Sequence, residues 1–390
     1  MRVAVCLVLL VSLPFLPLAH SGSVKVTGVK VLIPKGEITQ LTFGSIGSRK
    51  PSVDGAGRRF VFIRAGAVFL EDLNLGVADT LVPSGADDVM ISDAAKLVVL
   101  ASSSDLVGGE NADGSAEIFL HDVKTGALDQ ITHCAVGKDC TSPSIDKKGR
   151  WIAFLSPADI VAENPDENEE VFVHDRLGGT FTQITHTTAA TPSGNPVVTL
   201  TGKHVLFDSD ADPAGSNADG NREIFRYEIA TGLTEQLTNT TACTCRRPFP
   251  SKNGMFVAFE SDADGQLAGP NADGSTEIYL LKIPTGTFTR ITSSTADAEQ
   301  PSLSGNARYV AFESDGDLLV EGGNADRSRE IFLARILSSG VELTQVTNGT
   351  AETRSFAADL NTSGSRLFFV SDADLAGGGS GVRQVFVYAR

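Results

Sequence analysis

The chain repeats one segment of about 50 residues seven times, and this repeat limits the possible folds more than any other feature. Two apolar columns mark its register. The first column consists of Phe62, Leu100, Phe154, Phe207, Phe259, Phe312 and Phe369. The second column consists of the pairs Val68-Phe69, Ile118-Phe119, Val171-Phe172, Ile224-Phe225, Ile278-Tyr279, Ile331-Phe332 and Val385-Phe386. Repeats of this length pack against their neighbours, so we expect one domain over residues 36–390.

Each repeat reads as four short β-strands separated by Gly, Asn and Asp turns. In the third repeat the strands are PSIDKKG, RWIAF, EEVFVHD and FTQIT. Short runs of branched and aromatic residues favour buried strands, and no window shows the spacing of an amphipathic helix. Four-stranded units repeated around an axis predict an all-β, seven-bladed β-propeller of antiparallel blades.

The ends of the chain predict how the ring closes. A fourth-strand segment, KGEITQLT at 35–42, precedes the first complete repeat, whereas the last repeat ends at QVFVYAR without a fourth strand. We therefore expect residues 36–42 to complete the last blade. That pairing removes a sheet edge that would otherwise invite aggregation.

The N-terminus predicts export. Residues 1–21 combine one Arg, an apolar stretch and small residues at the end, as in a signal peptide, and a short lead follows at 22–35. The alternative is a retained membrane anchor, but the apolar run at 3–19 is short for a bilayer span. We expect a periplasmic or secreted monomer with no transmembrane segment in its mature part.

The formal net charge of -16 argues against nucleic acid as a partner. It leaves cations and basic proteins as candidate partners.

Four cysteines of the mature part lie in two loops between repeats. Cys134 and Cys140 can close a small disulfide loop, whereas Cys243 and Cys245 are separated by one residue and would need a tight bridge. An exported protein permits disulfides. The alternative is a metal site, but the loops lack a C-x-x-C spacing.

Five repeats carry an acidic loop between their second and third strands, with Ser-x-x-Asp, Asn-x-Asp and a following Glu. Such oxygen-rich loops can hold calcium. Alternatively, Asn and Asp bond their own backbone to shape the turn. The candidate metal ligands are Asp105, Asn111, Asp113, Glu117, Asp212, Asn217, Asp219, Glu223, Asp264, Asn271, Asp273 and Glu277.

The sequence shows no catalytic set. It contains no G-x-S-x-G elbow. His121 and His174 occupy equivalent strand positions in neighbouring repeats, which favours a structural role. We therefore predict no catalytic residue and expect a non-enzyme rather than an enzyme.

The segments PSIDKKGRWIAF, PSLSGNARYVAFESD and REIFRYEIATGLTEQLT resemble the TolB-like, WD-type propeller repeats of bacterial exported proteins. The resemblance covers residues 36–390 and implies a propeller used for protein contacts. Some similar propellers are pectin-oligomer lyases with a manganese site built from His and Gln. The sequence has no clustered set of His to match.

These observations predict an exported, non-catalytic scaffold that binds a protein or cell-envelope partner through its acidic loop face, since function concentrates in loops on a rigid scaffold. One alternative is a calcium-stabilised adhesive or matrix module. The other is a polysaccharide-acting enzyme, a lyase or hydrolase, with its site in the central channel. Convergence of Asp, Glu, His and Arg at the channel mouth would favour the enzyme.

Overall fold

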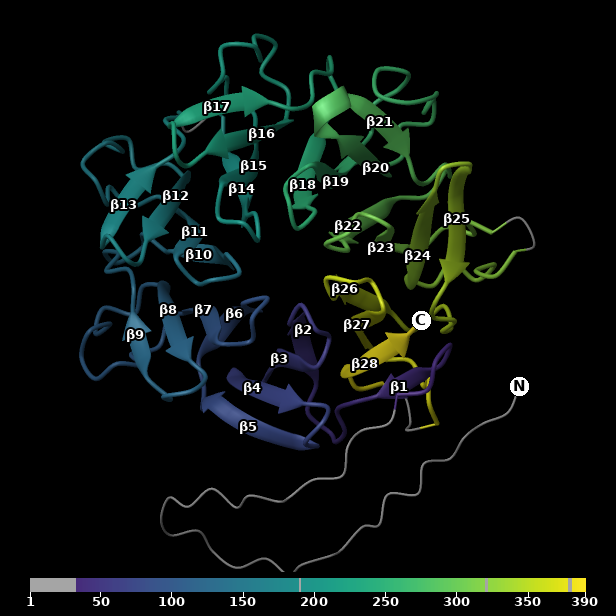
Figure 1. Ribbon diagram of the computed structural model, residues 1–390, viewed down its shortest axis with the longest axis horizontal. Helices are drawn as coiled ribbons and strands as arrows, with labels where there is room; N and C mark the ends of the chain where they lie inside the picture. The colour runs from purple at the N-terminus through teal and green to yellow at the C-terminus, as the bar shows by residue number, and fades with distance from the viewer. Residues whose placement is uncertain (1–32, 189–190, 320–321, 378–380) are drawn as a thin grey trace, which may run out of the picture.

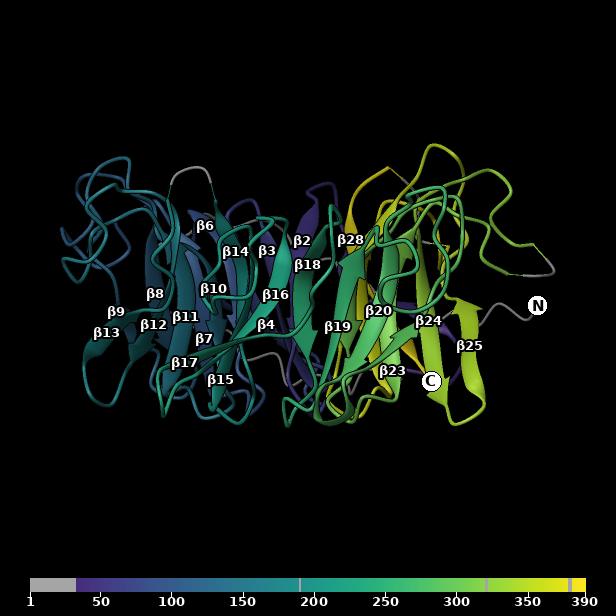
Figure 2. The same cartoon turned by 90° about the horizontal axis from the view of Figure 1, so that it is seen from above.

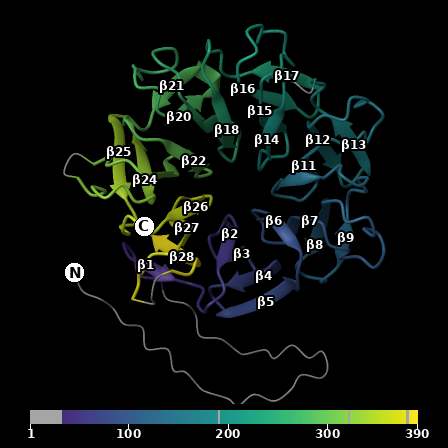
Figure 3. The ribbon, with the colours of Figure 1, turned by 180° about the vertical axis from the view of Figure 1, so that it is seen from behind.

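The computed structural model describes residues 33–188, 191–319, 322–377 and 381–390. In this part of the chain seven four-stranded antiparallel sheets stand around a central axis (Figure 1). Seen from behind, the innermost strands again surround that axis (Figure 3). Figure 2 shows the ring edge-on, with loops above and below the strands. The predicted seven-bladed β-propeller is confirmed.

The strands follow one another outward from the axis within each blade. Blades 1 to 4 contain β2 (Ser48–Val53), β3 (Arg59–Arg64), β4 (Ala67–Asp72), β5 (Val77–Val82), β6 (Ala86–Ile91), β7 (Leu97–Ser102), β8 (Glu117–Asp122), β9 (Leu128–Gln130), β10 (Thr141–Ile145), β11 (Trp151–Ser156), β12 (Glu170–Asp175), β13 (Thr180–Gln183), β14 (Ser193–Val198), β15 (His204–Ser209), β16 (Glu223–Glu228) and β17 (Leu233–Gln236). Blades 5 to 7 contain β18 (Cys245–Pro250), β19 (Phe256–Ser261), β20 (Glu277–Lys282), β21 (Thr287–Arg290), β22 (Ala298–Leu303), β23 (Tyr309–Ser314), β24 (Glu330–Leu337), β25 (Gly340–Gln345), β26 (Ser355–Leu360), β27 (Arg366–Ser371), β28 (Gln384–Ala389) and β1 (Ile38–Gln40).

The N-terminal strand completes blade 7, as its sequence predicts. β1 pairs with β28, with Thr39 opposite Val387. The buried hydroxyl of Thr42 donates to Gln384 Oε1 at 2.7 Å and accepts the backbone N–H of Val385 at 2.8 Å. First and last segments of the chain are thus joined in one sheet. The predicted signal peptide lies outside the described residues.

The two apolar columns meet inside every blade. Members of the first column pair across the sheet with the aromatic members of the second, for example Phe154 with Phe172. In six blades both partners are aromatic, and their ring centroids lie 5.4 to 5.8 Å apart in stacked geometry. The stacked pairs contribute beyond their buried area. They form the core of each blade.

The innermost strands are bent by a bulge near their start. Six of them hold a residue other than glycine at positive φ in their third position, or in the second position of the shorter β10, namely Lys50, Ser142, Asn195, Arg247, Gln300 and Ala357. Bulges re-aim the side chains around them. The second half of each innermost strand then runs along the central channel.

The only helix in the described part is the single 3₁₀ turn η1 (Ile283–Thr285). No helix there is long and apolar enough to cross a membrane.

Candidate functional site

One repeat position of the innermost strands faces the neighbouring blade at the channel; it is the fifth residue of β2, β22 and β26 and the fourth residue of the shorter β10. In blades 1, 3 and 6 this residue is a serine whose hydroxyl accepts a backbone N–H of the next blade, with distances of 2.9 to 3.2 Å. The serines are Ser52, Ser144 and Ser302. In blade 7 the position holds Asp359, which accepts the N–H of Val53 at 2.8 Å. Asp359 thus keeps the blade contact and adds a second carboxyl oxygen.

Asp359 is a half-buried acid without a cation. Its other oxygen accepts only a long hydrogen bond of 3.4 Å from the hydroxyl of Ser302. No Lys or Arg in the described part of the chain forms an ion pair with it. Protein surrounds the side chain, but it faces a cavity and water still reaches it. Burial, only partly offset by the N–H of Val53 and the other hydrogen bonds, raises the pKa of Asp359 from 3.8 to about 7.

Asp93 lines the same cavity, and its pKa is shifted in the opposite direction. Its carboxylate lies 2.8 Å from Lys147 Nζ and accepts the hydroxyl of Thr362. Burial alone would raise the pKa of Asp93, but these two bonds and the charges of Lys147 and Lys252 outweigh it, so the pKa is lowered. Blades 2, 3 and 7 therefore meet across the end of the channel.

Glycine makes this meeting possible. A Cβ built on Gly55 would lie 1.8 Å from Asp93 Oδ1, so no larger residue fits beside the carboxylate in its present place. The Asp93 carboxylate of blade 2 therefore occupies the space that a side chain at Gly55 of blade 1 would fill.

The cavity has a volume of about 70 Å³ and is lined by six of the seven blades. That volume holds roughly five water molecules. Its walls are mainly apolar, and its charged groups are Asp93, Asp359 and Lys252. A mostly apolar lining with a few converging polar groups is typical of ligand sites, which measure roughly 300 to 1,000 Å³, so this cavity has room for one end of a substrate only.

The opposite end of the channel carries a chain of ion pairs on blades 4 to 6. Buried Asp208, Glu260 and Glu313 each accept the N–H of the positive-φ residue in the next blade, at 2.6 to 2.8 Å. Each also binds an arginine, and Arg246 and Arg329 both contact Glu299. Asp, Glu and Arg, three of the four residue types whose convergence would favour the enzyme, thus converge at this mouth.

The histidines do not join them. His121 and His174 lie in the third strands of blades 2 and 3, and His174 stacks on Phe181 with centroids 4.4 Å apart. Burial lowers the pKa of both imidazoles. They are core residues that stay neutral.

The side-chain oxygens of the acidic loops mostly form hydrogen bonds within their own loops. Asp105 and Asp212 accept backbone N–H groups of the same loop, and Asp264 accepts that of Asn271. Asn111, Asn217 and Asn271 donate to carbonyls four residues on, at 2.7 to 2.9 Å. Asp113 and Asp273 each bind the serine two residues later, whereas Asp219 is exposed. Calcium binding by these residues remains a prediction.

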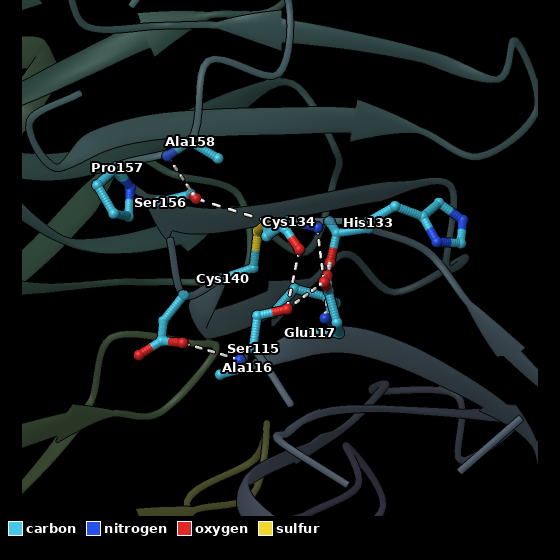
Figure 4. The surroundings of a disulfide bond; sticks show 12 residues. Ser115, Ala116, Glu117, His133, Cys134, Cys140, Ser156, Pro157 and Ala158 are labelled. Atoms are coloured by element: carbon cyan, nitrogen blue, oxygen red, sulfur yellow. Dashed lines mark hydrogen bonds between the residues drawn. A yellow bond between two sulfur atoms is a disulfide. The ribbon is translucent and has the colours of Figure 1, made fainter. Parts of the chain in front are cut away.

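The three glutamates of the candidate metal set are buried at the start of a third strand. Glu117, Glu223 and Glu277 each accept a backbone N–H from the loop after the fourth strand. Glu117 also accepts the hydroxyls of Ser115 and Thr132, as Figure 4 shows in part. These acids tie neighbouring segments together within each blade.

The cysteines differ between the two loops. Cys134 and Cys140 form a disulfide beside Glu117 (Figure 4). Cys243 and Cys245 are free thiols, so the structure corrects the expected second bridge. The reason is that the two thiols have separate hydrogen-bond partners, and Cys243 donates to the carbonyl of Thr241 in its own loop. Buried Cys245 donates instead to Ser261.

Asp93 and Asp359 were not among the residues predicted from the sequence. A signal for Asp359 was present, because the equivalent position holds serine in three blades and Met90, Val197 and Phe249 in the other three, so Asp359 is its only charged residue. Asp93 gave no such signal, since the turn position it occupies varies from Gly55 to Lys147.

No family model matches the chain, and no curated protein sequence matches it. Similar solved structures include an oligogalacturonate lyase in complex with manganese, 13% identical with a TM-score of 0.63, which covers 90% of this chain and 92% of its own. An oligogalacturonate lyase from Vibrio parahaemolyticus is 11% identical over the same shares, with a TM-score of 0.64. TolB from Acinetobacter baumannii is 16% identical with a TM-score of 0.45 and covers 88% of this chain and 63% of its own. At these identities the likeness shows the fold alone.

The comparison corrects the expectation of a non-enzyme, because enzymes share this fold over nearly the whole of both chains. Membership in the TolB-like, WD-type family stays a prediction, because no family model matches the chain.

A manganese centre does not fit the residues described here. Among them the only set of three ligand residues within 4.8 Å is Glu117, Cys134 and Cys140. Both cysteines are held in a disulfide, so Glu117 alone could bind a metal ion.

Proposed function

We propose that this protein is a polysaccharide-acting enzyme that cleaves a glycosidic bond in its central channel, with Asp359 as the proton-transferring group. The observation that carries the proposal is one cavity lined by two aspartates whose pKa values move in opposite directions. Two carboxyl groups whose surroundings shift their pKa values in opposite directions are typical of a general acid and its ionised partner in an active site.

The roles follow from the surroundings of each carboxyl group. Asp359 holds a proton near neutral pH and can donate it to the oxygen of the leaving sugar. Asp93 stays ionised through Lys147 and stabilises the positive charge that develops on the reacting ring. The apolar wall reduces the screening of both interactions by water.

The similarity to oligogalacturonate lyases supports a sugar substrate. Lys252 lines the cavity and forms no ion pair within the described residues, so it offers a positive charge to a sugar carboxylate. The predicted signal peptide would place the activity outside the cytoplasm, where such polymers occur.

The proposal is tested by incubating the mature protein with neutral and uronate-containing polysaccharides and measuring new chain ends. Reducing ends alone indicate hydrolysis, whereas ultraviolet-absorbing unsaturated ends indicate elimination. Asp359→Asn should lose at least about a hundredfold in rate, the usual contribution of a general acid. Ser144→Ala, which alters the same strand position in blade 3, is the matched control and should retain the rate. Equal rates for Asp359→Asn and the wild type would refute the proposal.

A further inference from the structure

We propose that the seam between blades 1 and 2 is a second binding site, for a small organic anion with an apolar face. This site lies at the outer side of the ring and shares no lining residue with the channel cavity.

In other seams the first residue of the second strand covers the turn of the following blade. A Cβ on Gly149 would lie 2.0 Å from Leu97, one on Gly202 would lie 2.8 Å from Trp151, and one on Gly364 would lie 2.6 Å from Tyr309. In blade 7 the equivalent Arg366 donates to the carbonyl of Gly57 in blade 1. Large side chains thus close these seams.

Blade 1 breaks this pattern. Its equivalent residue, Arg59, bonds to Asp72 of its own blade, with Nε 2.8 Å from Oδ2. The facing turn of blade 2 carries Ala95, at a φ of 54°, where the turns compared above carry glycine, so its Cβ takes space that a covering side chain would need. The seam therefore stays open, and a cavity of about 310 Å³ lies between the two blades.

The lining of this cavity combines an apolar floor with positive charge. Leu70 and Ala95 are 5% and 7% exposed, and Val77 and Val123 lie beside them. Lys96 and Lys124 stand exposed at its edge, and neither forms an ion pair within the described residues.

The charge balance selects the ligand. Arg59, Lys96 and Lys124 line the cavity against Asp72 and Asp79. Asp72 is held by Arg58 and Arg59, so the two lysines face the ligand with only Asp79 opposing them. In a chain of net charge -16 such a positive cavity attracts anions locally. Its floor favours a ligand that adds an apolar face to its charge.

Anilinonaphthalene sulfonate, an aromatic anion that fluoresces when bound out of water, is the probe. We expect saturable binding to the folded protein. Reversing both lysines, in Lys96→Glu with Lys124→Glu, should weaken it at least about tenfold. Arg59→Trp copies Trp151 of blade 3 and should close the seam and abolish binding.

Lys203→Glu is the matched control, because Lys203 occupies the position of Lys96 in the seam that Trp151 closes. It should leave binding unchanged. Absence of saturable binding to the wild type would overturn the proposal, as would equal effects of Lys203→Glu and the double variant. If Arg59→Trp fails to fold, as its thermal melt would show, the lysine variants decide alone.

Discussion

Replacing Asp359 by Asn should change how stability depends on pH. The pKa of Asp359 is about 7 in the folded protein and 3.8 in the unfolded chain, so the folded state binds the proton more tightly. Stability therefore falls as pH rises from the unfolded pKa to the folded pKa. In this interval the carboxyl group ionises freely in the unfolded chain but keeps its proton in the folded protein, so rising pH favours unfolding. Asn keeps an acceptor for the N–H of Val53 and carries no charge at any pH.

The magnitude follows from the two pKa values. A difference of one in pKa equals about 1.4 kcal/mol. The difference between 3.8 in the unfolded chain and about 7 in the folded protein therefore destabilises the native state by about 4 kcal/mol at high pH. Between about pH 5 and about pH 8 the loss is about 2.6 kcal/mol. We expect Asp359→Asn to gain that amount of unfolding free energy relative to the wild type over this interval.

Urea unfolding of both proteins at the two pH values measures this difference. Ser302→Ala, which removes the hydroxyl that contacts Asp359 but leaves the acid, serves as the control and should keep the pH dependence. A wild type and an Asn variant whose stabilities run parallel between the two pH values would refute a raised pKa at Asp359.

Three further predictions concern the rest of the ring. Thr42→Val removes the two hydrogen bonds that the Thr42 hydroxyl makes across the ring closure and should lower the unfolding free energy by about 2 kcal/mol in urea; an unchanged midpoint would mean that closure does not rest on Thr42. Reduction of the disulfide, or Cys134→Ser with Cys140→Ser, should lower the melting temperature, with a loss of about 2 kcal/mol for so short a loop; a melt insensitive to reductant would contradict this. Because Asp113 already binds Ser115, millimolar calcium should not raise the melting temperature relative to EDTA; a rise that Asp113→Ala abolishes would restore the calcium hypothesis.

The sequence predicts the fold well because the repeat encodes it locally. The columns of Phe154 and Phe172 define the second and third strands, and their pairing follows from a short hairpin. Ring closure was also predictable, since the displaced fourth strand before Phe43 has one sheet edge left to join.

The candidate site was far less predictable. Asp93 contacts Thr362, which lies 269 residues away in the sequence. No pattern within one repeat predicts that side chains of three blades come into contact. The raised pKa of Asp359 depends on how deeply the closed ring buries it, which composition does not give. The acidic loops attracted attention through their density of charge, yet side chains such as Asp113 are occupied by their own turns.

The most direct test of the channel as an active site is the pH dependence of kcat/KM for release of sugar chain ends from an acidic polysaccharide. If Asp359 donates a proton, activity should fall as pH rises through about 7, and Asp359→Asn should lose that limb together with most of the rate. Full activity of the folded Asn variant with an unchanged pH profile would contradict the account.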